Sequence, residues 1–218
     1  MPRYVTAGVL DVIGLEDPEQ VLKKIEHCGR VAYASWDKEG QGTAEKFVQM
    51  IIKLGHESVL EHASVTAIIE CDRSTAQQLT RHRLASFTMQ SQRYCNYSAD
   101  KFDKEVRFVL PEFKETGDGD KNLEAYATWQ LHMNISEQHY FDLLKLGCSP
   151  EDARSVLPNS TACVLAMTAN MREWRHIFKV RTEICAQHNV RRVMSELMAK
   201  MSEKVPCLFA DIGVAAPH

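Results

Sequence analysis

Apolar residues recur along the chain at two spacings, and each spacing predicts a different kind of element. The alternation over residues 4–13, 63–71 and 161–169 is rich in β-branched side chains and predicts three strands. Apolar residues spaced three and four apart predict helices between and after these strands. Together the two patterns predict a chain with few strands and much helix.

Capping residues predict where the helices begin and end. Asp17-Pro18 starts a helix through about residue 28, and Asp72 starts another through Leu79. Glycines close two more, a helix that begins at Thr43 and a long one that follows a loop over residues 111–121. The two closing glycines are Gly55 and Gly147. The segment 149–157 has a serine cap, a proline and two acids, and helical spacing returns within residues 171–204.

This order of elements predicts an α+β fold. Neither an internal repeat nor a linker divides the chain, so we expect a single domain over residues 1–218. With 218 residues the chain can bury one substantial core.

Composition narrows the class of protein. A net charge of −3 argues against a general nucleic-acid binder, which should be basic over much of its surface. Seven scattered cysteines without a CxxC pair indicate reduced thiols in a cytosolic protein. There is no signal-peptide layout, and no apolar run long enough to span a membrane. We therefore expect a soluble, cytoplasmic protein.

The segment RHRLASFTMQSQRY, residues 81–94, carries the clearest local charge. Three arginines surround hydroxyl and amide side chains, and guanidinium groups bind phosphate bidentately at any working pH. Arg81 and Arg83 point to different sides of any regular element, so they can serve two ligands. The competing interpretation of this segment is a solvated basic turn.

Two other segments contain candidate ligand-binding residues. GHESVLEH, residues 55–62, has the spacing H-x4-E-H, which matches neither HExxH nor HxxEH, so core or cofactor-contacting histidines are the better interpretation. NMREWRHIFKVR opens a stretch, residues 171–204, in which basic residues outnumber acidic ones by eight to four. Its polar residues do not form one helical stripe, although a solvated helix face remains the default interpretation.

Two further signals do not support a site. GQG at residues 40–42 lacks the third glycine of a dinucleotide-binding fingerprint, since Glu45 stands at that position. Cys207 follows a proline, but no neighbouring base or anion hole indicates a nucleophile, so a small buried thiol is favoured.

The 81–94 segment resembles the signature of flavin-dependent thymidylate synthases, which is Arg-His-Arg, seven residues, then Ser-x-Arg. Here these are Arg81-His82-Arg83 and Ser91-Gln92-Arg93. The resemblance continues in order through most of the chain, in residues 55–62, 153–158, 168–181 and 186–187.

The resemblance implies a fold, a reaction and an assembly. The fold would be that of this family, a small, mainly antiparallel sheet flanked by long helices. The reaction would convert dUMP to dTMP, with 5,10-methylenetetrahydrofolate as carbon donor, NADPH as reductant and FAD as hydride carrier. The assembly would be a homotetramer with sites where subunits meet, acting on small molecules without a metal.

The resemblance also assigns residues. Arg181 would lie against the uracil, where a fixed cation makes C6 a better hydride acceptor. The dUMP site would comprise Gln78, Arg81, Met89, Gln90, Ser91, Arg93, Arg154 and Arg181. The FAD site would comprise His56, Ser58, Arg81, His82, Arg83, Asn170, Arg172 and His176.

The chain departs from the family pattern at two places. Thr88-Met89 replaces a common Asn-Glu, so any role of that acid is lost or passes to Gln90. Residues 188–190 replace a stretch that is often Trp-Glu-Ile.

Two other classes compete with the enzyme. A non-catalytic uridine-nucleotide-binding protein would keep the phosphate arginines without needing Arg181. A metallohydrolase would need a metal-ligand set. The folate-binding residues, the preference for NADPH over NADH and the order of the two transfers are not specified by the sequence.

Overall fold

The computed structural model describes residues 2–113 and 119–213, so the predicted loop over 111–121 lies partly outside the described residues. The described chain is helix-rich, with two short sheets, and the predicted α+β class is confirmed. None of the described helices is both long and apolar enough to cross a membrane.

The described residues form two compact units. The first unit contains residues 2–7, 70–78 and 89–165, and the second contains residues 8–69, 79–88 and 166–213. The prediction of one domain over residues 1–218 stays a prediction.

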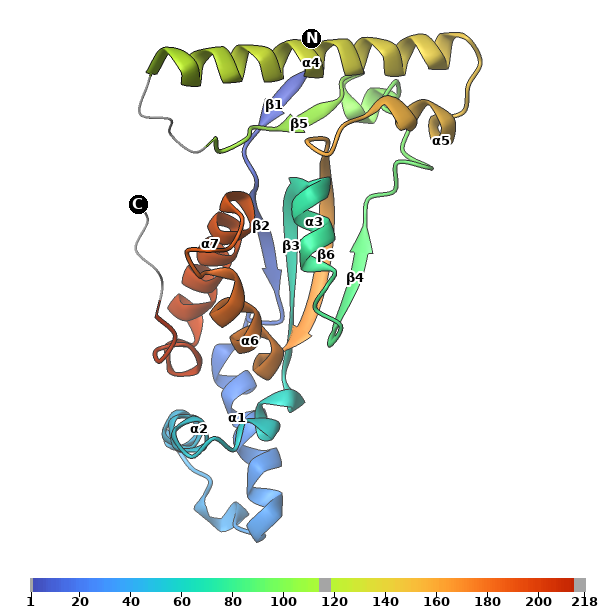
Figure 1. Ribbon diagram of the computed structural model, residues 1–218. Coiled ribbons are helices and arrows are strands. Elements are labelled where there is room, and N and C mark those ends of the chain that lie inside the picture. Colours follow the sequence, from blue (N-terminus) through green and yellow to red (C-terminus); the bar gives the residue numbers. More distant parts are fainter. Residues whose placement is uncertain (1, 114–118, 214–218) are drawn as a thin grey trace. The chain divides into compact units, whose positions relative to one another are not determined.

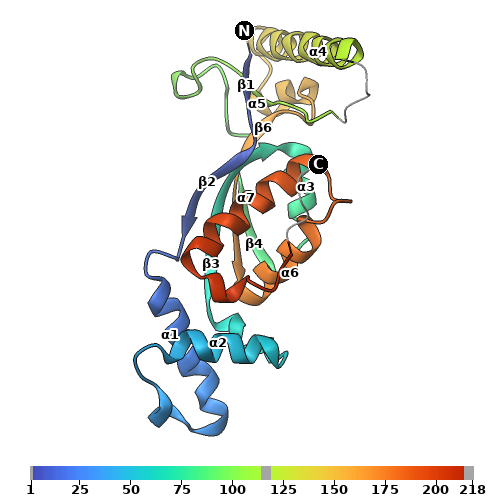
Figure 2. The same ribbon diagram turned by 90° about the vertical axis from the view of Figure 1, so that its left-hand side faces the viewer.

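A four-stranded sheet in the order β2-β3-β6-β4 supports the second unit. Neighbouring strand arrows point in opposite directions, and helices α6 and α7 lie along one face (Figures 1 and 2). The sheet buries mostly alternate apolar positions of β3 and β6. The elements are β2 (Gly8–Ile13), β3 (Ser64–Asp72), β4 (Ala85–Met89), β6 (Ala162–Asn170), α6 (Met171–Arg181) and α7 (His188–Lys204).

The predicted helix starts are confirmed by their hydrogen bonds. Asp17 Oδ1 accepts from the main-chain N–H of Gln20 at 3.0 Å and begins α1 (Pro18–Arg30). Asp72 Oδ1 accepts from the N–H of Thr75 at 2.7 Å and begins α3 (Arg73–Leu79). Such side-chain acceptors satisfy main-chain donors that the first helical turn leaves unpaired.

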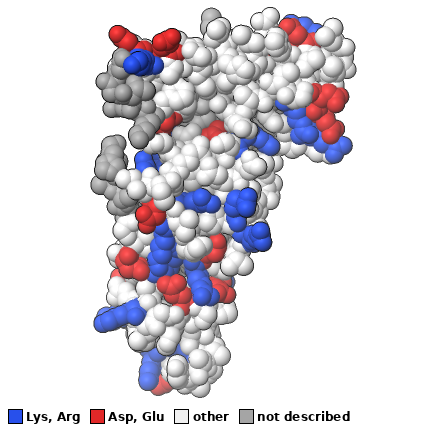
Figure 3. All heavy atoms as spheres, viewed as in Figure 1, with Lys and Arg blue, Asp and Glu red and all other residues white. Residues whose placement is uncertain are grey.

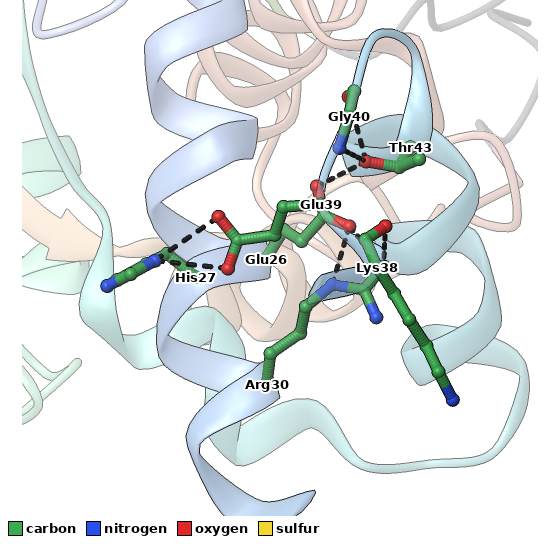
Figure 4. A network of polar contacts seen from close by, with 7 residues as sticks. All are labelled: Glu26, His27, Arg30, Lys38, Glu39, Gly40 and Thr43. Atoms are coloured by element: carbon green, nitrogen blue, oxygen red, sulfur yellow. Dashed lines mark hydrogen bonds and ion pairs between the residues drawn. The ribbon is translucent and has the colours of Figure 1, made fainter. Parts of the chain in front are cut away.

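A buried carboxylate fixes the loop between α1 and α2 (Thr43–Lys53) in the second unit (Figure 4). Glu26 accepts from Arg30 Nε at 2.9 Å and from Thr43 Oγ1 at 2.8 Å. Arg30 also donates to the carbonyl of Lys38 at 3.2 Å. Glu26 is 2% exposed, and both of its oxygens are hydrogen-bonded, as a buried charge requires.

Close helix packing requires the glycine near the end of α1. A Cβ atom on Gly29 would lie 2.5 Å from the Phe47 ring of α2 and 2.9 Å from the Val59 side chain. A larger residue would push α1 away from both neighbours.

The long predicted helix in the first unit is α4 (Gly119–Lys145), and it packs over a core that includes Tyr97, Phe108, Met133 and Tyr140. Beside it, β1 (Arg3–Val5) pairs in parallel with β5 (Arg107–Val109). The predicted 149–157 helix is α5 (Pro150–Ala153) followed by a 3-10 turn, Arg154–Val156.

Two boundaries differ from the prediction, and two short strands were not predicted. The strand over residues 4–13 is divided because β1 pairs with β5 whereas β2 pairs with β3. The basic region 171–204 forms two helices, α6 and α7, that are separated by residues 182–187. β4 and β5 (Arg107–Val109) were not predicted, because strands of five and three residues give only a short periodic signal.

Charged side chains of both signs lie near one another on the face shown in Figure 3. No broad positive area covers that face, so attraction of an anion there depends on local groups.

Candidate active site

The predicted site residues divide between the two units. All eight FAD candidates lie in the second unit, together with Arg181 of the dUMP set. The remaining dUMP candidates lie in the first unit, and these are Gln78, Met89, Gln90, Ser91, Arg93 and Arg154.

Two segments of the second unit bring most FAD candidates together. The 3-10 helix η3 (Glu57–His62) follows His56 and contains Ser58, and it adjoins the N-terminus of α6. The N–H of Met171 donates to the carbonyl of Ala63 at 2.9 Å, and Arg172 Nη1 lies 2.6 Å from Glu61 Oε1. These contacts hold His56 and Ser58 near the first turn of α6.

The first turn of α6 is suited to bind an anion. Asn170 caps the helix, because its Oδ1 accepts from the N–H of Glu173 at 2.8 Å. Arg172 is exposed, and its charge adds to the positive end of the helix dipole. The Glu61 carboxylate pairs with Arg172 here, so a negatively charged group already fits beside this arginine.

Arg175 shows why the basic residues of α6 do not form one stripe. Its side chain is 1% exposed and forms a two-pronged pair with Asp211, with both N–O distances at 2.7 Å. It also contacts Glu57 at 3.1 Å and donates to the carbonyl of Leu208. The interpretation of this stretch as a solvated face is therefore wrong for Arg175, which is a buried structural cation.

A hydrogen bond connects the end of α6 with the Arg81-His82-Arg83 segment. Arg181 Nε donates to His82 Nε2 at 2.9 Å. Burial and the charges of Arg181 and His176 lower the pKa of His82 to about 4, so its ring is neutral at pH 7. Since Nε2 accepts a hydrogen bond, the single ring proton sits on Nδ1.

His82, Glu173 and His176 place possible metal-ligand atoms within 4.8 Å of one another. A neutral imidazole binds a metal through its unprotonated nitrogen. In His82 that nitrogen already accepts from Arg181. The hydrogen bonding therefore favours a neutral His82 that positions Arg181 over a metal site at these residues.

The phosphate candidates of the first unit converge on one glutamate. Arg93 Nε lies 2.9 Å from Glu151 Oε2, and Arg154 Nε donates to the Glu151 carbonyl at 3.0 Å. Arg93 and Glu151 are both about half exposed. The two arginines thus sit beside one another at the surface, where an incoming phosphate can reach them.

Gln90, which follows β4, is held by two hydrogen bonds to Val164 of β6. Its N–H donates to the Val164 carbonyl at 2.8 Å, and its Oε1 accepts from the Val164 N–H at 3.2 Å. Gln90 Oε1 could replace the carboxylate that many family members have at the position of Met89, but this oxygen already accepts a hydrogen bond. Ser91 Oγ accepts from the N–H of Arg93 at 3.3 Å, which shapes the turn rather than marking a nucleophile.

Cys207 is buried, and burial raises the pKa of its thiol to about 11. A thiol with such a pKa is almost fully protonated at pH 7 and is a poor nucleophile. This agrees with the prediction of a buried thiol.

Two residues of the second unit escaped the sequence prediction. Glu173 contacts His82, and Arg175 anchors α6 to residues 208–211. Both lie within the segment that carried the resemblance, but only the folded arrangement distinguishes them from their exposed neighbours.

Known proteins resemble the chain over most of its length. The model of the family "Thymidylate synthase complementing protein" matches residues 15–207. The flavin-dependent thymidylate synthase of Pyrococcus furiosus is 35% identical over 181 residues, which are 83% of this chain and 71% of that protein. The Mycobacterium bovis protein of the same name is 33% identical over 203 residues, covering 87% and 79% of the two chains.

A solved structure shows the same fold. The UMP/dUMP methylase PolB from Streptomyces cacaoi, bound with 5-Br dUMP, superimposes with a TM-score of 0.76 at 23% identity and covers 99% of this chain and 100% of its own. The structural likeness shows the fold, whereas the family match and the two relatives show the family. The chain therefore belongs to the family of flavin-dependent thymidylate synthases.

Proposed function

We propose that this chain converts dUMP to dTMP, with 5,10-methylenetetrahydrofolate as carbon donor, NADPH as reductant and FAD as cofactor. The observation that carries the proposal is the hydrogen bond from Arg181 to His82. It joins two parts of the family pattern, Arg-His-Arg and the end of α6, in one arrangement. A nucleotide-binding protein without catalysis would not need this arrangement.

Arg181 supplies a fixed positive charge to the uracil ring. Its guanidinium is half-buried, and its Nε donates to His82, a neutral acceptor that helps to orient it. Placed against the N3–O2 edge of uracil, the cation stabilises negative charge there. Electron density is drawn from C6, which becomes a better hydride acceptor.

The residues of the second unit fit FAD. Asn170 and Arg172 at the helix N-terminus suit a pyrophosphate, while His56, Ser58, Arg81 and Arg83 offer exposed donors around it. His176 is exposed and offers a flat polar surface for the ring system, and the buried His82 lies beside it with the ring centroids 5.9 Å apart. Bound FAD supplies hydride transfer, which no side chain of this protein can supply.

The residues of the first unit fit the nucleotide phosphate. Arg93 and Arg154 take the phosphate, which replaces the Glu151 carboxylate beside Arg93. Arg81, which lies in the second unit, belongs to the same proposed dUMP set. Gln78, Met89, Gln90 and Ser91 complete the dUMP set through side-chain and main-chain contacts. We further propose that the protein acts in the cytoplasm as a homotetramer with its sites at subunit interfaces.

The test is spectroscopic. Purified protein with FAD should show an oxidised-flavin absorption spectrum that bleaches under anaerobic NADPH with dUMP present. Adding 5,10-methylenetetrahydrofolate should restore the spectrum and yield dTMP. Absence of flavin binding after incubation with FAD, or bleaching without dTMP, contradicts the proposal. UMP in place of dUMP measures the selectivity for the deoxynucleotide.

A further inference from the structure

Glu173 is a buried carboxylate with no assigned role, and it faces the histidine that holds Arg181. Its Oε1 lies 3.5 Å from His82 Nδ1, on the opposite side of the ring from the Arg181 contact. Both Glu173 and His82 are 7% exposed. His82 therefore contacts an acid at one ring nitrogen and a cation at the other.

The position of the proton on His82 follows from hydrogen-bond chemistry. A guanidinium can only donate, so Nε2 of His82 must accept and carries no proton. The ring proton then sits on Nδ1, the nitrogen that lies 3.5 Å from Glu173 Oε1. A carboxylate at this position favours that tautomer over the alternative, in which Nε2–H would face Arg181 and its hydrogen bond would be lost.

Helix α6 fixes the position of Glu173. Its N–H is bound by the Asn170 side chain at 2.8 Å, and the next residue, Trp174, is fully buried and donates through Nε1 to the Val65 carbonyl at 3.0 Å. The acid also lies in the first turn, near the positive end of the helix dipole. Its main chain is therefore held firmly while its carboxylate faces His82.

We propose that Glu173 is a positioning residue that holds His82 in the Nδ1–H tautomer and thereby orients the Arg181 guanidinium. Glu173 has no contact with the reacting groups in this role. The catalytic consequence rests on the proposed function, because it assumes that Arg181 acts on uracil. The tautomer itself does not depend on that assumption.

The experiment compares Glu173→Gln with Glu183→Gln. Each change replaces one acid at or just beyond an end of α6, but Glu183 is exposed and outside the proposed sites. The amide that Glu173→Gln introduces can donate to Nδ1, which favours the wrong tautomer. Protein labelled with nitrogen-15 in histidine reports the tautomer by NMR, with His82 assigned from the His82→Gln spectrum.

We expect the unchanged protein and Glu183→Gln to show the Nδ1–H tautomer, and Glu173→Gln to show a mixture or the Nε2–H form. Removal of such a supporting carboxylate should lower kcat about tenfold or more and leave KM for dUMP within about twofold. A conservative Glu173→Asp change should restore the tautomer in part.

Two results would overturn the proposal. One is an Nε2–H tautomer of His82 in the unchanged protein, and the other is an unchanged tautomer and kcat in Glu173→Gln. If Glu173→Gln does not fold, Glu173→Asp and the unchanged protein still decide the question by NMR. An Nδ1–H tautomer in a protein that makes no dTMP would refute the proposed function and support the positioning of His82.

Discussion

The arginines of the two units are held in opposite ways. Arg181 of the second unit is half-buried and donates to the neutral His82. The other ring nitrogen of His82 lies near the buried Glu173. Arg93 of the first unit is exposed and is paired directly with the Glu151 carboxylate. A neutral acceptor orients a cation without cancelling its charge, whereas a surface carboxylate can be displaced by a phosphate. The first arrangement suits catalysis, and the second suits binding.

Removal of the oriented cation should have the largest effect. In Arg181→Ala, the barrier should rise by about 3–4 kcal/mol and kcat should fall roughly a hundredfold to a thousandfold, because a preorganised charge is lost. The protein should remain folded and keep its flavin. Steady-state kinetics and flavin absorbance measure both, with Arg191→Ala on α7 as the matched control. Near-normal turnover of Arg181→Ala would remove the basis for its role.

Removal of a surface arginine should affect binding instead. Arg93→Ala and Arg154→Ala should each raise KM for dUMP about tenfold to a hundredfold, the range for hydrogen bonds to charged groups, with little change in kcat. Arg3→Ala, which removes an exposed arginine paired with exposed Asp103, is the control. A fall in kcat at constant KM would mean that these arginines act on the reaction and not on the phosphate.

Added salt should change KM for dUMP, which depends on the exposed arginines, more than kcat, which depends on Arg181. Raising NaCl from about 50 mM to about 200 mM should increase KM for dUMP a few-fold, because exposed charges are screened at these concentrations. The kcat should change little, since the Arg181–His82 contact is between a cation and a neutral group. A salt-dependent kcat with a constant KM would contradict the assignment of the exposed arginines to binding and of Arg181 to catalysis.

Acid should act on His82 through the stability of the fold. The pKa of His82 is lowered by burial, Arg181 and His176, with Glu173 also facing the ring. The unfolded chain therefore binds more protons than the folded one between pH 6.5 and about 4, so stability falls as pH drops through this range. Urea unfolding at several pH values should show a shallower loss in His82→Gln than in the unchanged protein. Parallel curves would show that His82 does not titrate in this way.

The smallest effect is expected at Cys207. With the pKa of its thiol raised to about 11, it should take no part in catalysis, and Cys207→Ser should keep kcat within about twofold. Any loss should appear in thermal stability, since the side chain is buried. Loss of turnover in a stably folded Cys207→Ser protein would indicate a thiol mechanism.

Local signals predicted the elements but not all of their boundaries. Asp17, Asp72 and Ser149 each cap the helix that their sequence context predicts, because capping depends on residues within one turn. β4 and β5 escaped prediction because strands of five and three residues carry too little periodic signal. Their pairing partners lie far away in the sequence.

The sequence predicted which residues belong to the site, but it did not predict the hydrogen bonds and ion pairs between them. The signature motif indicated His82, and the resemblance indicated Arg181, but their contact joins residues 99 positions apart. Glu173 and Arg175 differ from Arg172 in burial, which depends on how α6 packs. The pairing of Arg93 and Arg154 through Glu151 likewise appears only in the folded chain.

The most direct test of the account follows the carbon atom. Purified protein with FAD, NADPH and dUMP should be given 5,10-methylenetetrahydrofolate labelled with carbon-13 in its methylene group, and the nucleotides should be analysed by mass spectrometry. The account predicts dTMP with the label in its methyl group, formed by the unchanged protein and nearly absent with Arg181→Ala. Unlabelled dUMP alone, from protein that binds both flavin and nucleotide, would contradict it.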